Sequence, residues 1–188
     1  MEQVVKKDIL SILTKSYETI RRKQYYKLKS ISDTIIHNSV ITQDESCILL
    51  TVVIYSLSKI YERESYREYD DFKILDTVVV NELKKAFNSA SNNKTVEYEE
   101  SLRNILKVYT KLTSKLSGHV KEIIENAKIN RASRLYEHGV SLGRTSEILG
   151  ISEFDLMSYV GKTGIGDVSL GINKKIADRI KFTRGLFR

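Results

Sequence analysis

Apolar residues recur every three or four positions along most of the chain, which is the spacing of amphipathic helices. In the first such segment, Val5, Ile9 and Ile20 fall on one face. This spacing predicts helices over residues 4–23, 27–37, 45–63, 71–88 and 95–112. The chain is therefore expected to begin with a series of helices rather than with strands.

The segment 45–63 differs from the others because it is apolar nearly all round, and such a helix is expected in the middle of a bundle. The motif Thr42-Gln43-Asp44-Glu45 in front of it matches a capping box. Its most apolar part, residues 47–61, is about fifteen residues long, which is shorter than the ~20 residues that a membrane crossing needs. The N-terminus carries no apolar signal-peptide segment. We therefore expect a cytoplasmic protein with no membrane contact.

A polar stretch at residues 89–93 separates two of the predicted helices, and Thr95 is a candidate N-cap for the second of them. We expect Gly118 to end or bend that helix. Helical spacing resumes immediately afterwards. Residues 1–127 are therefore predicted to form one helical bundle domain.

The composition favours an all-α fold. The chain has 188 residues with no proline and nine glycines, and these two residue types are the strongest helix breakers. The net charge of +7 permits contact with nucleic acid or with an acidic partner. Residues 1–127 hold 20 basic and 18 acidic residues, whereas residues 128–188 hold 11 and 6. Most of the excess positive charge therefore lies in the C-terminal third.

A helix-turn-helix-like unit is predicted over residues 128–166, with short helices at 128–138, 142–149 and 153–160. Gly150 lies between the last two helices, where a sharp turn requires a left-handed backbone. Ser152 is a candidate cap for the third helix. The residues expected to build the motif and its small core are Ser146, Leu149, Gly150, Ile151, Leu156 and Tyr159.

Three features of this unit carry a family resemblance: the Ser-Leu-Gly start at 141–143, the Glu-Ile-Leu-Gly centre at 147–150, and Phe154. Through them, residues 135–166 resemble a small family of prokaryotic antitoxins. The resemblance implies a helix-turn-helix and a toxin partner, often a PIN-domain ribonuclease. Thr145 and Ser146 depart from the family's usual Ala-Ala, and a long helical domain replaces its short N-terminus. The whole chain also resembles a group of archaeal helical proteins, which implies a fold but no activity.

In a helix-turn-helix, the start of the last helix enters the DNA major groove. The candidate nucleic-acid contacts here are Ser152, Phe154 and Ser158, with Arg144 and Lys162 beside them. However, residues 142–161 hold one arginine and three acidic residues. Phosphate contacts normally come from lysine and arginine, so this charge argues against simple operator binding. The alternative is a unit that docks a protein.

The segment 167–188 is predicted to form a basic amphipathic helix, because Ile172, Ile176 and Ile180 recur at every fourth position. Its candidate phosphate contacts are Lys174, Lys175, Arg179, Lys181 and Arg184. Such a helix can lie on phosphates or dock on an acidic partner, or it can pack back on the domain with its cations in water.

A second basic cluster, residues 21–29, has five cations, no acidic residue and two tyrosines. It can hold an RNA or DNA backbone with tyrosine stacking added. The alternative is a helix end and turn whose cations face water and whose tyrosines pack.

No residue pattern indicates catalysis. His37, His119 and His138 are scattered without metal-ligand spacing, and Cys47 lies in an apolar run where a buried, inert thiol is expected. The acidic run within residues 62–71 is interpreted as a solvated connection between helices. We expect neither an enzyme nor a bound cofactor.

The leading hypothesis from the sequence is a nucleic-acid-associated regulator of the antitoxin kind, with DNA preferred to RNA as its target. In that case the N-terminal domain dimerises or holds a partner such as a PIN-type toxin. The rival hypothesis is a protein-interaction module that does not need nucleic acid. A third is an accessory protein on RNA, which the distributed positive charge permits.

Overall fold

The computed structural model describes residues 3–42 and 45–163. The secondary structure of these residues is helical and contains no strand, so the predicted all-α class is confirmed. The helices are α1 (Gln3–Arg21), α2 (Lys27–Thr42), α3 (Glu45–Tyr61), α4 (Phe72–Ser91), α5 (Thr95–Leu106), α6 (Leu116–Glu137), α7 (Leu142–Leu149) and α8 (Glu153–Thr163), with short 3-10 helices η1 (Glu64–Glu68) and η2 (Val108–Lys111).

Helix α3 lies in the middle of the fold, as its apolar pattern predicts. All of its residues except Glu45, Tyr55 and Lys59 are buried. It contacts α1, α2, α5, α6 and α7. Cys47 is buried on this helix, as expected. None of the described helices is long and apolar enough to cross a membrane.

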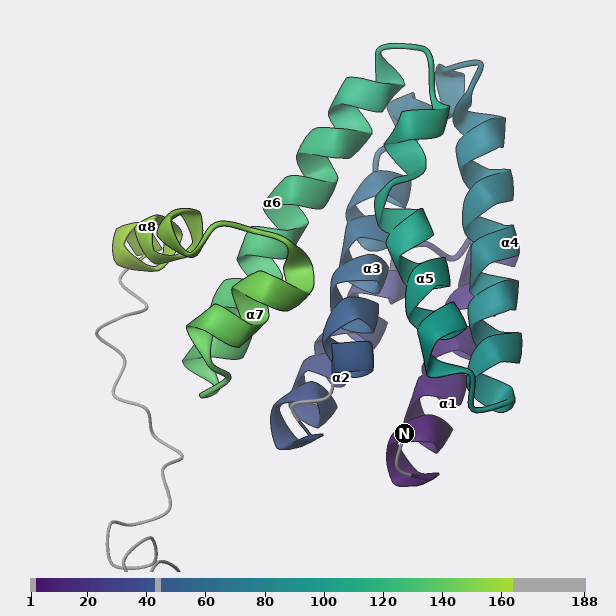
Figure 1. The fold of residues 1–188 in the computed structure, drawn as a ribbon. Helices are drawn as coiled ribbons and strands as arrows, with labels where there is room; N and C mark the ends of the chain where they lie inside the picture. Colours follow the sequence, from purple (N-terminus) through teal and green to yellow (C-terminus); the bar gives the residue numbers. More distant parts are fainter. Residues whose placement is uncertain (1–2, 43–44, 164–188) are drawn as a thin grey trace, which may run out of the picture.

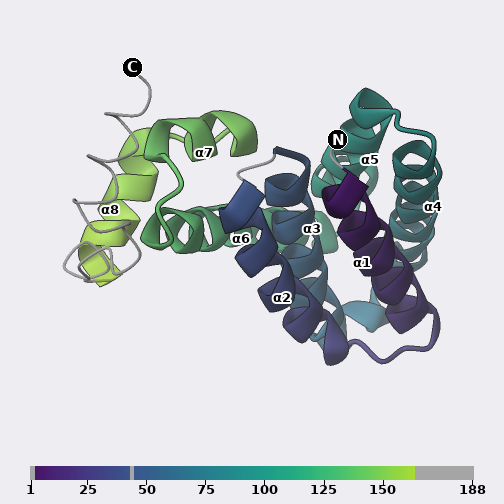
Figure 2. The same ribbon diagram turned by 90° about the horizontal axis from the view of Figure 1, so that it is seen from below.

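The molecule has two parts that share one long helix. Helices α1 to α5 form a bundle, and α6 runs along one side of it against α3 (Figure 1). Helices α7 and α8 lie on α6, and α8 is farther than α7 from the bundle (Figure 2). The unit formed by α6, α7 and α8 therefore projects from the side of the bundle.

Helix α6 is one continuous helix, although the sequence pattern suggests a break within it. Gly118 is in the first turn of α6 and does not end the preceding helix. The predicted boundary between residues 127 and 128 falls inside this helix, and the first helix predicted for the C-terminal unit is its second half. Because this one helix belongs to both parts, it fixes the position of α7 and α8 relative to the bundle.

A second link between the two parts is made by Arg103 of α5. Its Nη1 donates to the carbonyl oxygen of Ile148 in α7 at 3.2 Å, and its Nη2 donates to Glu45 of α3 at 2.7 Å. The carbonyl groups of a helix's last turn lack helical partners, so a cation is favourable there. Arg103 therefore fastens the end of α7 to the bundle.

Two predictions about the fifth helix are wrong. Thr95 is the first residue of α5, and the capping position before it is Lys94, which makes no side-chain cap. The helix also ends at Leu106, so Tyr109 and Leu112 lie in and after η2. The amides that follow η2 donate to a distant carboxylate instead of continuing a helix.

That carboxylate is Asp71, the residue before α4. It accepts hydrogen bonds from the amides of Thr113 at 2.8 Å and Ser114 at 2.9 Å, and from the Ser114 hydroxyl at 2.6 Å. Asp71 is buried, although the sequence interpretation placed it in a solvated acidic run. It ties the start of α4 to the loop that leads into α6.

Two predictions fall where the structure gives no description. The capping box at Thr42 includes residues 43 and 44, which lie outside the described residues. The basic segment 167–188 also lies outside them.

The turn between α7 and α8 has the predicted geometry. Gly150 has φ +61°, in the left-handed region, and the amide of Ile151 donates to the carbonyl of Ser146 at 3.0 Å. Leu149 and Leu156 are buried, as is the small side chain of Ser146, while Ile151 is half-buried. Tyr159 is also half-buried, and its hydroxyl accepts a hydrogen bond from Asn130 of α6 at 3.3 Å. All six predicted motif residues thus lie in α7, in α8 or in the turn between them.

Replacing Gly150 with alanine is expected to lower the free energy of unfolding by about 1–2 kcal/mol, because a Cβ is strained at this φ. The added Cβ meets no atom within 4 Å, so no steric clash contributes. Urea denaturation measures the effect. Gly118→Ala is the matched control, since that site is helical and equally open, and it should be neutral or slightly stabilising. Equal losses at both sites would contradict the turn argument.

Candidate functional site

The outer face of α8 carries exposed apolar side chains. Phe154 is 80% exposed and Met157 is 51% exposed, and their three-residue spacing places them on one side of the helix. Leu156 and Val160, which are four residues apart, are buried on a neighbouring side of the helix. Ser158 is half-buried and Gly161 is exposed. The structure thus brings predicted contact residues together on a surface that is more apolar than charged.

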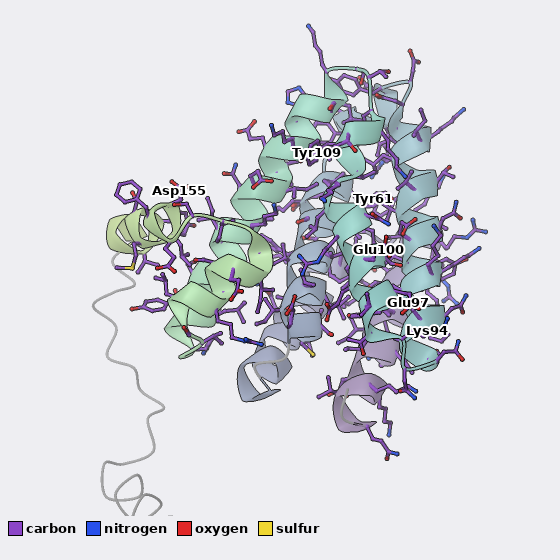
Figure 3. All side chains as sticks on the ribbon, viewed as in Figure 1. Tyr61, Lys94, Glu97, Glu100, Tyr109 and Asp155 are labelled. Carbon is purple, nitrogen blue, oxygen red and sulfur yellow. The ribbon has the colours of Figure 1, made fainter. Side chains whose placement is uncertain are left out.

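Acidic groups border this face. Asp155 is exposed on α8, at the end of the molecule farthest from α4 and α5 (Figure 3). The amide of Asp155 lies 3.5 Å from the Ser152 hydroxyl, the contact expected for a capping serine. A carboxylate oxygen of Glu153 lies 3.1 Å from the position that a Cβ on Gly143 would take. Glu153 therefore lies beside the first turn of α7, where the helix dipole favours a negative charge.

Few cations accompany this face. Arg144 is exposed on α7 and is the one basic residue in 142–161. The side chain of Lys162 lies outside the described residues, as do all five tail residues that the sequence nominated, Lys174, Lys175, Arg179, Lys181 and Arg184. The described parts of α7 and α8 thus present apolar and acidic groups rather than a phosphate-binding surface.

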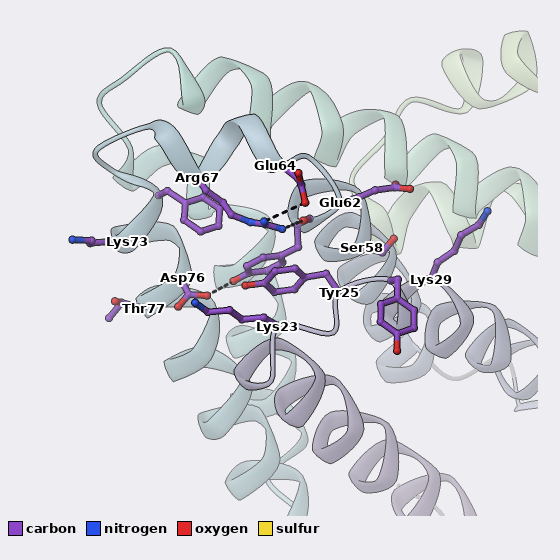
Figure 4. Close-up of a pocket in the computed structure, with 13 residues that line it drawn as sticks. Lys23, Tyr25, Lys29, Ser58, Glu62, Glu64, Arg67, Lys73, Asp76 and Thr77 are labelled. Carbon is purple, nitrogen blue, oxygen red and sulfur yellow. Dashed lines mark hydrogen bonds and ion pairs between the residues drawn. The ribbon is translucent and has the colours of Figure 1, made fainter.

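The basic cluster 21–29 borders a pocket of about 850 Å³ between the α1–α2 turn, α3 and α4 (Figure 4). Its two tyrosines behave differently. The Tyr25 ring stacks on the Tyr61 ring with their centres 4.8 Å apart, and the guanidinium of Arg67, in η1, lies 5.0 Å from the centre of the Tyr25 ring. Tyr26 is 78% exposed. Tyr25 therefore packs, as expected if the cluster is a helix end and turn, whereas Tyr26 does not.

Charges in this pocket nearly balance, since four cations and three carboxylates line it. The Tyr61 hydroxyl donates to Asp76 at 2.8 Å (Figure 4). Burial, and then the negative charge of Asp76, raise the pKa of Tyr61 well above its usual value. The hydroxyl therefore stays protonated at neutral pH and is not an activated nucleophile. The arrangement stabilises the junction of α3 and α4.

A second pocket, of about 450 Å³, lies between α2, α3 and α6. At its base is Arg131, which is 4% exposed. Its guanidinium lies 3.6 Å from the centre of the Tyr55 ring, and its Nη1 pairs with Asp33 at 2.9 Å. Burial lowers the pKa of Arg131, and the hydrogen bond and charge of Asp33 oppose that shift. The other lining residues are Lys29, Asn130, Arg134 and His138.

The sequence analysis missed this pocket because its residues come from three separate helices. One signal was available, however. Ile124, Ala127, Arg131 and Leu135 recur at three- and four-residue spacings, and all four are buried on α6. An arginine in register with an apolar stripe indicates a buried charge that needs a partner.

The described residues contain no group of three or more histidine, cysteine or acidic side chains that could hold a metal ion. Comparisons with protein-family models, with curated proteins and with solved structures find no match for this chain. Two surfaces of the described residues are therefore candidate functional sites, namely the outer face of α8 and the pocket around Arg131.

Proposed function

We propose that this protein is a non-catalytic regulator that acts by binding a protein partner through the outer face of α8. The observation that carries the proposal is the exposure of Phe154 and Met157 on one side of this helix. An aromatic ring and a thioether are typical anchors of protein interfaces, because both gain from leaving water. Their position next to a firmly packed turn gives a partner a fixed surface to recognise.

The charge around this face indicates what the partner is like. Glu153 and Asp155 of α8 are exposed, whereas Arg144 is the one cation among the side chains that the structure describes in residues 142–163. A complementary partner has an apolar groove with a basic rim. A second copy of the same face would bring like charges together, which disfavours a homodimer through α8. The antitoxin resemblance makes a PIN-type toxin ribonuclease a suitable partner of this kind.

Nucleic acid is a second candidate target, and a different surface favours it. Lys29 lines both pockets, so cations continue from the α1–α2 turn across α2 to the end of α6. The exposed ring of Tyr26 lies on the same side and offers a surface for base stacking. DNA or RNA bound here would leave α8 free.

The test uses the full chain as bait in a native lysate, with and without nuclease, followed by binding measurements on the purified partner. Phe154→Asp is expected to weaken that partner's binding by roughly 30-fold or more, the effect of losing a central interface anchor. Val96→Asp is the matched control, because Val96 is 76% exposed on α5 and receives the same charge. It should leave the affinity unchanged.

A partner that survives nuclease and binds both variants equally would rule out docking through α8. If nuclease removes every partner, the nucleic-acid candidate replaces the proposal. Dissociation of a dimer by Phe154→Asp, measured by analytical ultracentrifugation, would identify a second copy as the occupant and overturn the charge argument.

A further inference from the structure

We propose that the pocket between α2, α3 and α6 binds a phosphate group, with Arg131 at its base and Lys29 and Arg134 at its rim. This site does not involve α8. It therefore goes beyond the docking function and stands or falls independently of it. The proposal rests on the unsatisfied guanidinium of Arg131, on the balance of charge in the pocket, and on the pocket's size.

Arg131 is incompletely paired for a buried arginine. A guanidinium has five N–H donors, and buried charges are normally paired and hydrogen-bonded throughout. The ion pair to Asp33 uses Nη1, while Nε has no hydrogen-bond partner among the described residues. Asp33 itself is about half exposed, with 52% of its side chain accessible. Asp33 therefore offsets only part of the positive charge of Arg131, and a second anion in the pocket would offset the rest.

The charges that line the pocket do not cancel. Lys29, Arg131 and Arg134 are cations, and Asp33 is the one carboxylate among the lining residues. Glu137 lies 3.6 Å from Arg134, but both belong to α6 and Glu137 does not line the pocket. Among the lining residues alone the surplus is two positive charges, and the ion pair of Arg134 with Glu137 offsets part of it.

A phosphate monoester suits this surplus better than a simple carboxylate. It carries about −1.5 to −2 charge at pH 7 and offers three acceptor oxygens. Arginine's planar fork matches phosphate oxygens, and lysine adds a flexible point charge. The volume of about 450 Å³ is within the usual range for small-molecule sites. Asn130 and His138 also line the pocket and leave polar surface for the organic part of such a molecule.

Isothermal titration calorimetry of the full chain with adenosine monophosphate and with inorganic phosphate tests the site. Lys29→Gln and Arg134→Gln are each expected to weaken binding by roughly tenfold, the loss of one charge-assisted hydrogen bond. Both residues are exposed, so neither substitution disturbs the core. Asp33→Asn is expected to tighten binding several-fold, because it removes the carboxylate that competes for Arg131.

The control variants are Lys7→Gln and Lys15→Gln, which remove the same charge from exposed positions on α1. They should leave the affinity unchanged. Equal weakening by site and control variants would show a general charge effect and overturn the proposal. The proposal would also be overturned if neither adenosine monophosphate nor inorganic phosphate gave binding heat at about 10 mM ligand. A third contrary result is an Asp33→Asn variant that binds no more tightly than the natural chain.

The phosphate could belong to a free molecule or to a nucleic-acid strand, and a third probe separates these sources. This probe is a single-stranded RNA of about ten nucleotides with a 5′-hydroxyl, so that all its phosphates are diesters. Stronger binding of the monophosphate, with the expected variant pattern, identifies a free phosphate ester. Stronger binding of the RNA with the same pattern identifies a strand and links the pocket to the nucleic-acid candidate.

Discussion

Asp71→Ala is expected to lower the free energy of unfolding by about 3 kcal/mol, because hydrogen bonds to a charged acceptor are among the strongest. The carboxylate collects three of them, two from backbone amides and one from a hydroxyl. Without it, the loop between η2 and α6 loses its attachment to the start of α4. Urea denaturation followed by circular dichroism measures the loss.

The same residue is expected to make stability depend on pH. Burial acts to raise the pKa of Asp71, but hydrogen bonds from Ser114 and Thr113 outweigh it and hold the pKa below its usual value. A carboxyl with a lowered folded-state pKa stabilises the fold above its unfolded-state pKa, and this contribution disappears as the pH falls through the folded-state value. Between neutral pH and about pH 3, the natural chain should therefore lose more stability than Asp71→Ala.

Asp70→Ala is the control, since Asp70 is the neighbouring residue and is exposed. It should change the free energy of unfolding by less than about 0.5 kcal/mol. Asp71→Asn should lie between the two, because an amide oxygen still accepts but carries no charge. An Asp71→Ala variant as stable as Asp70→Ala would show that water replaces the carboxylate without loss.

Local patterns predicted the elements of this fold well. The apolar spacing located the helices, and the all-round apolar character of residues 45–63 placed α3 at the centre. The turn at Gly150 was predictable because its backbone conformation excludes most other residues. These features depend on neighbours in the sequence, so the sequence was sufficient to find them.

Features that depend on distant residues were not predictable in the same way. Asp71 lies 42 and 43 positions from its hydrogen-bond partners, and nothing in an acidic run distinguishes the buried member from the exposed ones. Gly118 was interpreted as a point where a helix ends or bends because glycine is a weak helix former, but it is the third residue of α6 and the helix continues through it.

The candidate sites illustrate the same distinction. The charge of residues 142–161 already argued against DNA binding by α8, and the helix-turn-helix pattern already placed Phe154 among the outward-facing residues of that helix. The pocket around Arg131 joins residues from α2, α3 and α6, so no local window contains it. A buried arginine in an apolar stripe was its one trace in the sequence.

Replacing Arg131 separates a stabilising role from a binding role. Arg131→Ala is expected to cost about 3 kcal/mol, because it leaves a cavity beside Tyr55 and between α3 and α6. Arg131→Met, which nearly conserves the side-chain volume, should stay within about 1 kcal/mol of the natural chain. The thioether packs on the Tyr55 ring, and no buried charge has to be desolvated. Asp33 remains half exposed and solvated.

Both variants should lose adenosine monophosphate binding by more than roughly tenfold, since neither keeps the guanidinium. Arg134→Met is the matched control for stability, because Arg134 is exposed on the same helix and should tolerate the change. A methionine variant that is stable but does not bind phosphate would mean that the buried charge is retained for the ligand. If Arg131→Met is instead as unstable as Arg131→Ala, the ion pair with Asp33 and the contact with Tyr55 serve the fold itself, and the pocket is their by-product.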